Sequence, residues 1–541
     1  MATPSSLGIQ VQEERGPHRS IESFAPARTA FVGRTLRGPE NRPTPVQSFA
    51  DFQQTFGGLW QPSLLGYAVE HFFDNGGREA LIVRVVNGAR AATLTLPAQD
   101  GAALVLQALR PGTREYLRAS VDYDNIAADA LDEFNLTIQR VAAHATARVE
   151  YQETFRNLSV CGGTAAALDA ALGASELVRL FGPVPRTRPR RTVDPATGQA
   201  SGFIHSSPDG DDGDVLTDYD LIGSAVEHTG VFALDGVDHF SFLVIPPLSR
   251  EADLGVATLI VAARYCRQRN AMLLVDPPLG WQTADEALAG IAAWGFASED
   301  AFMYFPRILA HDKLRGRFET FAPSGAVAGM LARSEAIAPA WAAAEIEEPV
   351  LRPGYRPSCL VPERLRGGLA KAGINVLQAV RPSTPPMLPA RTLAAAHAGA
   401  ADWQHLATRR FALSLVASIA AGTREFALKL PYQFVEMQVR AYLEHLYEAR
   451  SFGDRSRDDA FFVGVDTEDE ADPEARRVVL IVGFAACRRG DYHSFRITHA
   501  GASTQIESVT VNRLRHRPDG PGDIPRVNGR AAPVHGGRNG P

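Results

Sequence analysis

The sequence predicts a multidomain α/β protein with an α/β core sheet, a β-rich insertion within that core, and an α+β C-terminal domain. Its 541 residues correspond to roughly three or four domains at about 150 residues each. Between 237 and 305, strand-like and helix-like segments alternate, which is typical of a parallel sheet covered by helices. Between 88 and 151, short β-like runs separated by turn residues indicate an inserted β-domain.

The predicted core comprises residues 25–87 and 152–380. Its first part contains a strand Ala30–Gly33, a strand Pro45–Phe49, an amphipathic helix Leu64–Phe73 and a strand Ala80–Val86. Its second part alternates strands and helices in the order Phe240–Ile245, Gly255–Arg269, Ala271–Val275, Thr283–Trp294 and Ala301–Phe305. Strand-like runs alternating with helical patterns predict βαβ units and therefore a mainly parallel sheet.

The predicted insertion covers 88–151, and a long loop follows in the second part of the core. The insertion offers the short runs Thr93–Leu96, Leu104–Leu109, Tyr116–Val121, Phe134–Val141 and Ala147–Tyr151. Between 182 and 219 lie a basic run, Arg186–Arg191, and an acidic run, Asp209–Asp214. Charged runs rich in Gly and Pro predict a surface loop.

The predicted C-terminal domain covers 381–512, after the Pro-rich boundary Arg381–Pro389. Its expected elements are two helices and three strands, Arg409–Gly422, Tyr432–Arg450, Phe461–Val465, Val478–Ala486 and His493–Thr498, with Ser508–Val511 as a further strand candidate. Residues 513–541 are rich in Gly, Pro and Arg and predict a disordered tail. Residues 1–24 are predicted to be an arm whose strand, Ile9–Gln12, has too few apolar neighbours to fold alone and must pair elsewhere.

Composition restricts the possible functions. The chain has 55 Lys and Arg against 61 Asp and Glu, a net charge of −6, which argues against nucleic acid as the main partner. Its four cysteines are scattered without metal-ligand spacing, so neither a zinc site nor a disulfide framework is expected. The N-terminus lacks the apolar region of a signal peptide, and no apolar stretch reaches the length that spans a bilayer. We therefore expect a protein that folds in a reducing compartment and does not insert into membranes.

Three residues raise the alternative of a hydrolase. Asp276 ends a predicted strand, Ser324 stands at a predicted helix start, and His311 lies between them. The competing structural interpretation is that Asp276 ends a strand and Ser324 caps a helix. Because no motif of a serine hydrolase surrounds these residues, we expect no catalytic site.

The charged runs offer two further alternatives. The acidic residues of Asp209–Asp220 could hold Ca²⁺, but they lack the spacing of a calcium loop, and a solvated acidic loop is the favoured interpretation. Arg186–Arg191 could contact nucleic acid, but in an acidic chain we expect it to pair with acidic loops of a neighbouring subunit. No cofactor or metal site is predicted.

The helix Tyr432–Arg450 has an apolar and a charged side. The candidates for its buried face are Phe434, Met437, Val439, Tyr442, Leu443 and Leu446. The charged residues Glu436, Arg440, Glu444 and Glu448 form a stripe along another face. A core helix with one solvated side accounts for both observations.

Several short phrases along the chain occur in an order that is itself informative. They are Ala30-Phe31-Val32-Gly33, Phe56-Gly57-Gly58, Asn75-Gly76-Gly77, Asp276-Pro277-Pro278, Pro323–Gly329, Gly373-Ile374-Asn375-Val376 and Ala390-Arg391-Thr392-Leu393. In this order they resemble the contractile tail sheath proteins of bacteriophages, R-type pyocins and related injection particles. The resemblance extends roughly from Leu7 to Ala500 and implies a subtilisin-like core fold without a catalytic function.

The resemblance implies a structural subunit that polymerises around an inner tube and contracts to drive the tube through a cell envelope. Its partners would be identical subunits in stacked, six-fold rings, the inner tube protein, and baseplate and terminator or cap proteins. Strands exchanged between subunits would be marked by Ile9, Val11, Phe461, Val463, Val465, Val479, Ile481, Phe495 and Ile497. The β-hairpin 461–486 would be completed by the N-terminal strand of one neighbour and the strand His493–Thr498 of another. The helix Tyr432–Arg450 would face the tube through Glu436, Arg440, Glu444 and Glu448.

Two other functions remain as alternatives, a hydrolase on the same scaffold and a static shell protein. The expected location is the tail of a virion or of a contractile particle assembled in the bacterial cytoplasm. The sequence leaves open whether the particle is a phage tail, a pyocin-like particle or an extracellular injection system. A type VI secretion sheath is disfavoured because that sheath is usually built from two chains.

Overall fold

The computed structural model describes residues 21–23, 28–143, 148–160, 165–193, 202–336, 350–378, 389–396, 403–424, 426–468, 477–485, 492–501 and 503–509. The chain divides into two compact units. Residues 26–406 belong to the larger unit, and residues up to 25 together with those from 407 onward belong to the C-terminal unit. The predicted arm strand Ile9–Gln12 and the predicted tail 513–541 lie outside the described residues.

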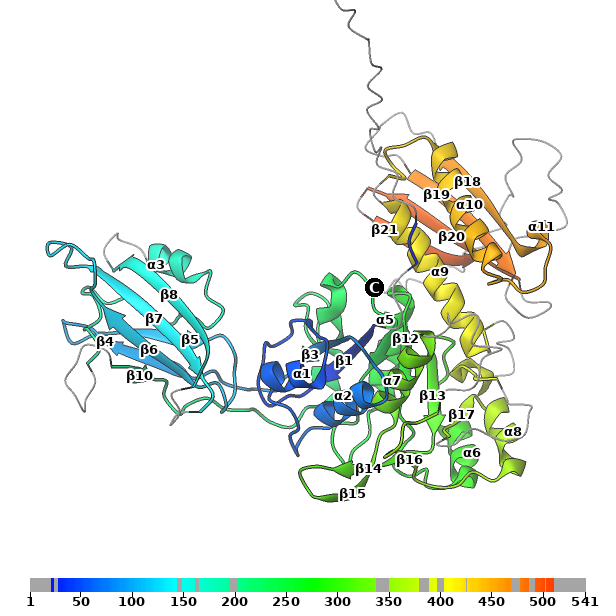
Figure 1. Cartoon of the computed structure of the whole chain (residues 1–541), viewed down its shortest axis with the longest axis horizontal. Helices are drawn as coiled ribbons and strands as arrows, with labels where there is room; N and C mark the ends of the chain where they lie inside the picture. The colour runs from blue at the N-terminus through cyan, green and yellow to red at the C-terminus, as the bar shows by residue number, and fades with distance from the viewer. Residues whose placement is uncertain are drawn as a thin grey trace, which may run out of the picture. The chain divides into compact units, whose positions relative to one another are not determined.

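The core of the larger unit is a sheet of seven strands in the order β17-β13-β12-β11-β1-β3-β2 (Figure 1). Its strands are β1 Thr29–Gly33, β2 Thr44–Val46, β3 Ala80–Arg84, β11 Phe242–Val244, β12 Met272–Val275, β13 Ala301–Phe305 and β17 Ile374–Val376. All neighbouring pairs are parallel except β2 and β3. The continuous apolar character of these strands follows from burial on both faces, as expected of a parallel sheet.

Helices cover both faces of this sheet. Ala30 and Val32 of β1 face a core shared with one group of helices, α4 Asp218–Ile222, α5 Val256–Gln268, α6 Ala284–Ala293, α8 Glu363–Lys371 and the 3₁₀ turn η1 Gly230–Gly236. Phe31 points to the opposite face because side chains alternate along a strand. There its ring meets Phe72 at 5.4 Å between centroids. The helices on or beside this second face are α1 Phe49–Phe56, α2 Leu65–Asp74 and α7 Ser324–Glu335.

Local sequence signals account for the ends of several helices. The Ser48 hydroxyl accepts a hydrogen bond from the Asp51 N–H at the start of α1. Thr217 and Asp220 form a capping box at α4, and Thr283 and Glu286 form another at α6. These side chains satisfy backbone N–H groups that have no partner inside the helix. The helices predicted at Leu64–Phe73, Gly255–Arg269 and Thr283–Trp294 correspond to α2, α5 and α6, and their ends agree to within one residue.

A short antiparallel hairpin projects from the end of β13. It consists of β14 Ile308–Asp312 and β15 Arg317–Phe321, with the bridge strand β16 Arg356–Pro357 beside β14. The Phe321 ring packs on Tyr67 and His71 of α2, with both pairs of centroids 5.0 Å apart. The hairpin therefore lies on the α2 side of the core.

The β-rich insertion is longer than the sequence predicted. Its elements are β4 Thr93–Pro97, β5 Ala103–Ala108, β6 Leu117–Asp122, β7 Glu133–Val141, β8 Val149–Ser159, α3 Ala165–Leu172, β9 Val178–Leu180 and β10 Ile204–His205. They form a sheet β10-β6-β7-β8 and a sheet β4-β5-β9 around one apolar core. Because β8 pairs with β7 along its length, the predicted boundary at 151 is wrong. The sequence signal was weak because β8 is mostly exposed and lacks an apolar alternation.

The C-terminal unit packs two helices on a four-stranded antiparallel sheet. Its elements are α9 Leu406–Arg424, α10 Tyr432–Glu448, α11 Arg457–Ala460, β18 Phe461–Glu468, β19 Arg477–Ala485, β20 Tyr492–Ala500 and β21 Ser503–Val509. The strand order is β18-β19-β20-β21. The predicted boundary at 381 is also too early, because the 3₁₀ turn η3 Leu393–Ala396 packs against β13 and α8 of the core.

Candidate functional site

The predicted linking strands gather in the sheet of the C-terminal unit. One face of this sheet carries Phe461, Val463 and Val465 of β18 and Phe495 and Ile497 of β20, on either side of Phe484, Val482 and Leu480 of β19. Residues directly opposite each other in antiparallel strands share a face. The Phe484 ring contacts Phe411 of α9 at 5.5 Å between centroids. This face is therefore the internal core of the unit.

Val479 and Ile481 belong to the predicted linking residues but lie on the other face of the sheet, because they alternate with Val478, Leu480 and Val482 along β19. On that face Phe462 stacks on Tyr492 at 5.9 Å between centroids and covers Gly483. The predicted set thus combines residues of both faces.

The strand β20 pairs with β19 of its own chain over nine residue pairs, from Arg477↔Ala500 to Ala485↔Tyr492. This pairing corrects the expectation that Phe495 and Ile497 belong to a strand supplied by a second neighbour. Within the described residues, β18 pairs only with β19 and β21 only with β20, so the sheet ends in two open edges. Open edges expose N–H and C=O groups that can bind a further strand.

The root of the N-terminal arm lies on the C-terminal unit. Ile9 and Val11 are outside the described residues. Ile21 is buried and packs beside Gly422 of α9. The approach is so close that a Cβ atom added at Gly422 would lie 3.0 Å from the Ile21 side chain. The Ser23 and Tyr442 hydroxyls are 2.9 Å apart, which ties the segment to α10. The sequence signal was a single apolar residue in a polar stretch, which periodicity cannot detect.

The charged stripe predicted on α10 lies on the accessible part of that helix. Val435, Val439, Tyr442, Leu443 and Leu446 form its buried face. Met437 was predicted to be buried but is 53% exposed, and Phe434 is half-buried. Arg440 and Glu448 are exposed, and Glu436 and Glu444 are half-buried.

Two of the glutamates on α10 already have partners. Arg440 forms an ion pair of 2.8 Å with Glu436, and Arg457 forms one with Glu444. The stripe is therefore a mixed surface that includes an exposed methionine and internal ion pairs.

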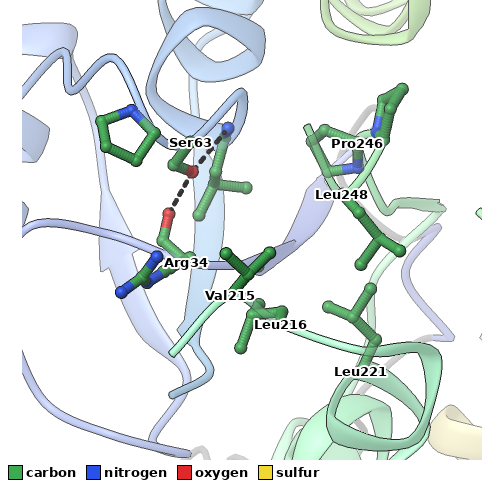
Figure 2. A pocket seen from close by; sticks show the side chains of 11 residues that line it. Arg34, Ser63, Val215, Leu216, Leu221, Pro246 and Leu248 are labelled. Atoms are coloured by element: carbon green, nitrogen blue, oxygen red, sulfur yellow. Dashed lines mark hydrogen bonds between the residues drawn. The ribbon is translucent and has the colours of Figure 1, made fainter. Parts of the chain in front are cut away.

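The edge of the core sheet where a ligand would be expected is filled. In the sheet, β3 and β2 lie on one side of β1, whereas β11, β12, β13 and β17 follow one another on its other side. The strand order therefore reverses between β1 and β11. In open α/β sheets, ligands bind beyond the carboxyl ends of strands at such a point. Figure 2 shows this crevice, with side chains from Val215, Leu216, Leu221 and Leu248 lying across it.

The space that remains there is about 20 Å³, room for about one water molecule. The Ser63 hydroxyl donates a hydrogen bond of 2.5 Å to the Arg34 carbonyl and accepts one of 3.2 Å from the Leu65 N–H (Figure 2). The crevice thus serves the packing of the core and has no volume for a substrate.

Asp276 and Ser324 meet, but not as a catalytic pair. The Asp276 carboxylate accepts the Ser324 N–H and the Ser324 hydroxyl, both at 2.8 Å. Ser324 is completely buried, so its hydroxyl cannot reach a substrate. His311 is exposed on β14 beside the Phe318 ring, and its described contacts include neither Asp276 nor Ser324. Ser324 also does not cap α7 as expected, since the Asp276 carboxylate performs this role from the end of β12.

The two charged runs between 182 and 219 are structural. The Arg188 guanidinium donates to the Ala130 and Glu133 carbonyls, and Arg190 donates to Ala98. Arg191 forms an ion pair of 2.6 Å with Asp124. These bonds give Arg188, Arg190 and Arg191 partners within their own chain. The expected pairing of the run with acidic loops of a neighbouring subunit stays a prediction.

The acidic run is bonded in the same way. Asp209 accepts both the N–H and the hydroxyl of Thr93, and Asp212 accepts both from Thr113. The interpretation as a solvated acidic loop is therefore incomplete, because two of its carboxylates are hydrogen-bonded to the insertion. Among the described residues, no group of three or more His, Cys, Asp or Glu side chains is arranged to hold a metal ion.

Asn375 has a structural role that the sequence did not reveal. Its amide donates to the carbonyls of Met303 and Arg391, both at 2.9 Å, and its carbonyl accepts the Arg391 N–H at 2.7 Å. A single side chain thus joins β17, β13 and the segment before η3. An asparagine between Ile374 and Val376 in a buried strand was the available signal.

Comparison with known proteins identifies the fold. No family model and no curated protein matches the chain. The contracted helical sheath of the anti-feeding prophage is similar over 90% of this chain and 98% of its own, with 15% identity and a TM-score of 0.50. The sheath tail protein Lin1278 from Listeria innocua is similar over 88% of this chain and 96% of its own, with 13% identity and a TM-score of 0.57. None of the helices in the described ranges is both long and apolar enough to cross a membrane. The fold of this chain is that of the contractile tail sheath proteins.

Proposed function

We propose that this protein is the structural subunit of a contractile tail sheath, which polymerises around an inner tube and contracts to drive the tube through a target envelope. The observation that carries the proposal is the likeness to sheath proteins over nearly the whole length of both chains. The filled crevice at the switch point and the buried Ser324 favour a mechanical function over hydrolysis. The seven-stranded, mainly parallel sheet with helices on both faces supports the subtilisin-like description of the core.

The proposed linkage between subunits uses the open edges of the C-terminal sheet. The arm strand around Ile9 and Val11 of one subunit would add to β18 or β21 of another, since backbone groups at an open edge accept a further strand. The root of the arm at Ile21 and Ser23 supports this, because it starts the arm on the unit that carries the edges. The charged face of α10 would contact the tube through polar pairs that can be released during contraction.

The proposed partners are identical subunits in stacked six-fold rings, the inner tube protein, and baseplate and terminator or cap proteins. The proposed location is the tail of a virion or of a contractile particle assembled in the bacterial cytoplasm. Neither nucleic acid nor a lipid bilayer is proposed as a partner.

Assembly of the purified full-length protein tests the proposal. In negative-stain electron microscopy we expect hollow tubes or stacked rings. Particles of one fixed lattice, with and without the tube protein, would indicate a static shell. A protein that remains monomeric at high concentration and moderate salt would contradict the sheath function.

A further inference from the structure

One segment of the core combines exposed apolar side chains with negative charge. The acidic segment, defined as residues 214–227, contains α4 and has four Asp or Glu residues and no Lys or Arg. Tyr219 is 85% exposed and Val226 is 89% exposed. Asp214 and Glu227 are exposed near its two ends. Exposed aromatic and large apolar side chains that are flanked by polar residues make this segment a candidate contact for a protein partner.

A second surface has the opposite charge. The basic hairpin, defined as residues 313–318 at the turn between β14 and β15, has three Lys or Arg residues and no Asp or Glu. Leu314 and Phe318 on this turn are about half exposed. The Arg356 guanidinium lies 5.1 Å from the centre of the Phe318 ring and adds a further positive charge.

The acidic partners of the basic hairpin lie beneath it. The Lys313 side chain is 61% exposed and its partner Glu70 only 3%. The Arg317 side chain is 68% exposed and its partner Glu319 19%. The cations therefore form the outer layer, and the hairpin presents a positive face to an approaching molecule.

The two surfaces lie on opposite sides of the core sheet. The Asp218 carboxylate of the acidic segment accepts the Gly255 N–H and the Thr258 hydroxyl at the start of α5. The basic hairpin is fixed to α2 through the Tyr67 hydroxyl, which donates to Asp312 at 3.1 Å, and through Lys313 and Glu70 at 2.7 Å. The helices α5 and α2 cover opposite faces, as the alternation of Ala30, Phe31 and Val32 requires.

From this arrangement we infer that cores of neighbouring copies dock on each other, with the acidic segment of one copy covering the basic hairpin of the next. The inference rests on the proposed function and specifies a contact outside the C-terminal sheet. The partner is a second copy because the same chain carries both complementary charges and both sets of apolar anchors. A contact between two different surfaces is heterologous, and its repetition generates rings or helices instead of closed two-fold dimers.

Charge reversal on each surface tests the contact. The acidic-segment variant carries Asp214→Lys and Glu227→Lys, and the hairpin variant carries Arg315→Glu and Arg317→Glu. We expect each variant alone to need at least tenfold more protein than the wild type to form tubes or rings, measured by sedimentation and negative-stain microscopy. A mixture of the two variants, and the chain with all four changes, should assemble again, because the reversed side chains of the two surfaces then face each other with opposite charge.

A control variant, Arg364→Glu with Lys371→Glu, changes the net charge of the exposed surface of α8 by the same amount as the hairpin variant. It should assemble as the wild type does. Thermal melting followed by circular dichroism verifies that all variants are folded. Tyr219→Ser with Val226→Ser removes the apolar anchors without changing charge, and it should also impair assembly.

Four results would be decisive against the contact or the proposed function. The docking is wrong if both reversed variants assemble normally. It is also wrong if assembly is not recovered in the mixture and in the chain with four changes. Both outcomes leave the sheath function in place. A hairpin variant that forms empty tubes normally but no longer surrounds the inner tube assigns this surface to the tube protein and also overturns the docking. A wild-type protein that does not assemble contradicts the proposed function itself.

Discussion

The Asp276 carboxylate receives two hydrogen bonds of 2.8 Å from Ser324, one from the backbone N–H and one from the hydroxyl. These bonds join the end of β12 to the first residue of α7, 48 positions later in the chain. A carboxylate at a helix start satisfies an unpaired N–H and interacts favourably with the helix dipole. Burial nevertheless raises the pKa of Asp276 to about 6, although the nearby Arg307 guanidinium opposes the rise.

Replacing Asp276 tests this link. Asp276→Ala leaves the N–H and hydroxyl of Ser324 without their acceptor, and each such group costs about 1–3 kcal/mol when buried. We expect a loss of this order in the free energy of unfolding, measured with urea, whereas Asp285→Ala on the exposed surface of α6 should cost less than about 0.5 kcal/mol. An Asp276→Ala protein as stable as the control would show that α7 is held by other contacts.

Asp276 also predicts a pH dependence. Because the pKa is raised in the folded state from 3.8 to about 6, the folded protein binds this proton more tightly than the unfolded chain. The resulting stability is fully present below pH 3.8 and is lost as the pH rises through 6, with a maximum of about 3 kcal/mol. Asp276→Asn should remove this component, so the difference in unfolding free energy between variant and wild type should change between pH 4 and 7. A constant difference would contradict the raised pKa.

His499 predicts a pH dependence of the opposite sign in the C-terminal unit. It is buried, with Nε2 2.8 Å from the Thr423 hydroxyl and Nδ1 3.0 Å from the Thr504 hydroxyl. Burial lowers the pKa of His499 from 6.5 to about 4, with a smaller contribution from Arg424. The unfolded chain therefore takes up this proton first, and stability is lost as the pH falls from 6.5 through 4.

We expect His499→Gln to lose less unfolding free energy than the wild type between pH 7 and 4.5, by about 2–3 kcal/mol. His445→Gln, on the exposed surface of α10, serves as the matched control and should follow the wild type. The prediction fails if His499→Gln and the wild type lose stability in parallel.

Deleting Met1–Arg19 should abolish assembly without unfolding the protein. The deletion keeps Ile21 and Ser23, whose contacts with α9 and α10 belong to the folded C-terminal unit. Thermal melting should be unchanged, and tubes should be absent by microscopy. Removing 513–541 is the control truncation and should preserve assembly. Loss of thermal stability on deleting Met1–Arg19 would mean that the arm strand completes its own chain.

Reversing the charges on α10 should separate the sheath from the tube. In Glu436→Lys, Glu444→Lys and Glu448→Lys combined, the ion pairs with Arg440 and Arg457 are lost, and exposed pairs contribute only about 0.2–1 kcal/mol each. The protein should stay folded and form empty contracted tubes, with few extended particles on the tube. The control carries Asp129→Lys, Asp285→Lys and Glu363→Lys on the larger unit. Extended particles formed equally by both variants would indicate that the tube is contacted elsewhere.

The sequence alone determined the elements of the core and their order. These elements are encoded by residues that are close together in the sequence. The strand Ala301–Phe305 is a continuous apolar run, and the start of α6 is marked by the capping box of Thr283 and Glu286. The same local patterns predicted the strands β18, β19 and β20 and the helix α10, each close to its observed ends.

Only the tertiary structure decided which distant segments meet. The exposed strand β8 joins the insertion through its pairing with β7, and β20 pairs with β19 of its own chain. Asp276 meets Ser324, Ile21 meets Gly422, and leucines from 216–248 fill the crevice beyond β1 and β11. Local periodicity carries no information on these contacts, because each joins groups that are far apart in the chain and is selected by packing and hydrogen-bond satisfaction in the folded protein.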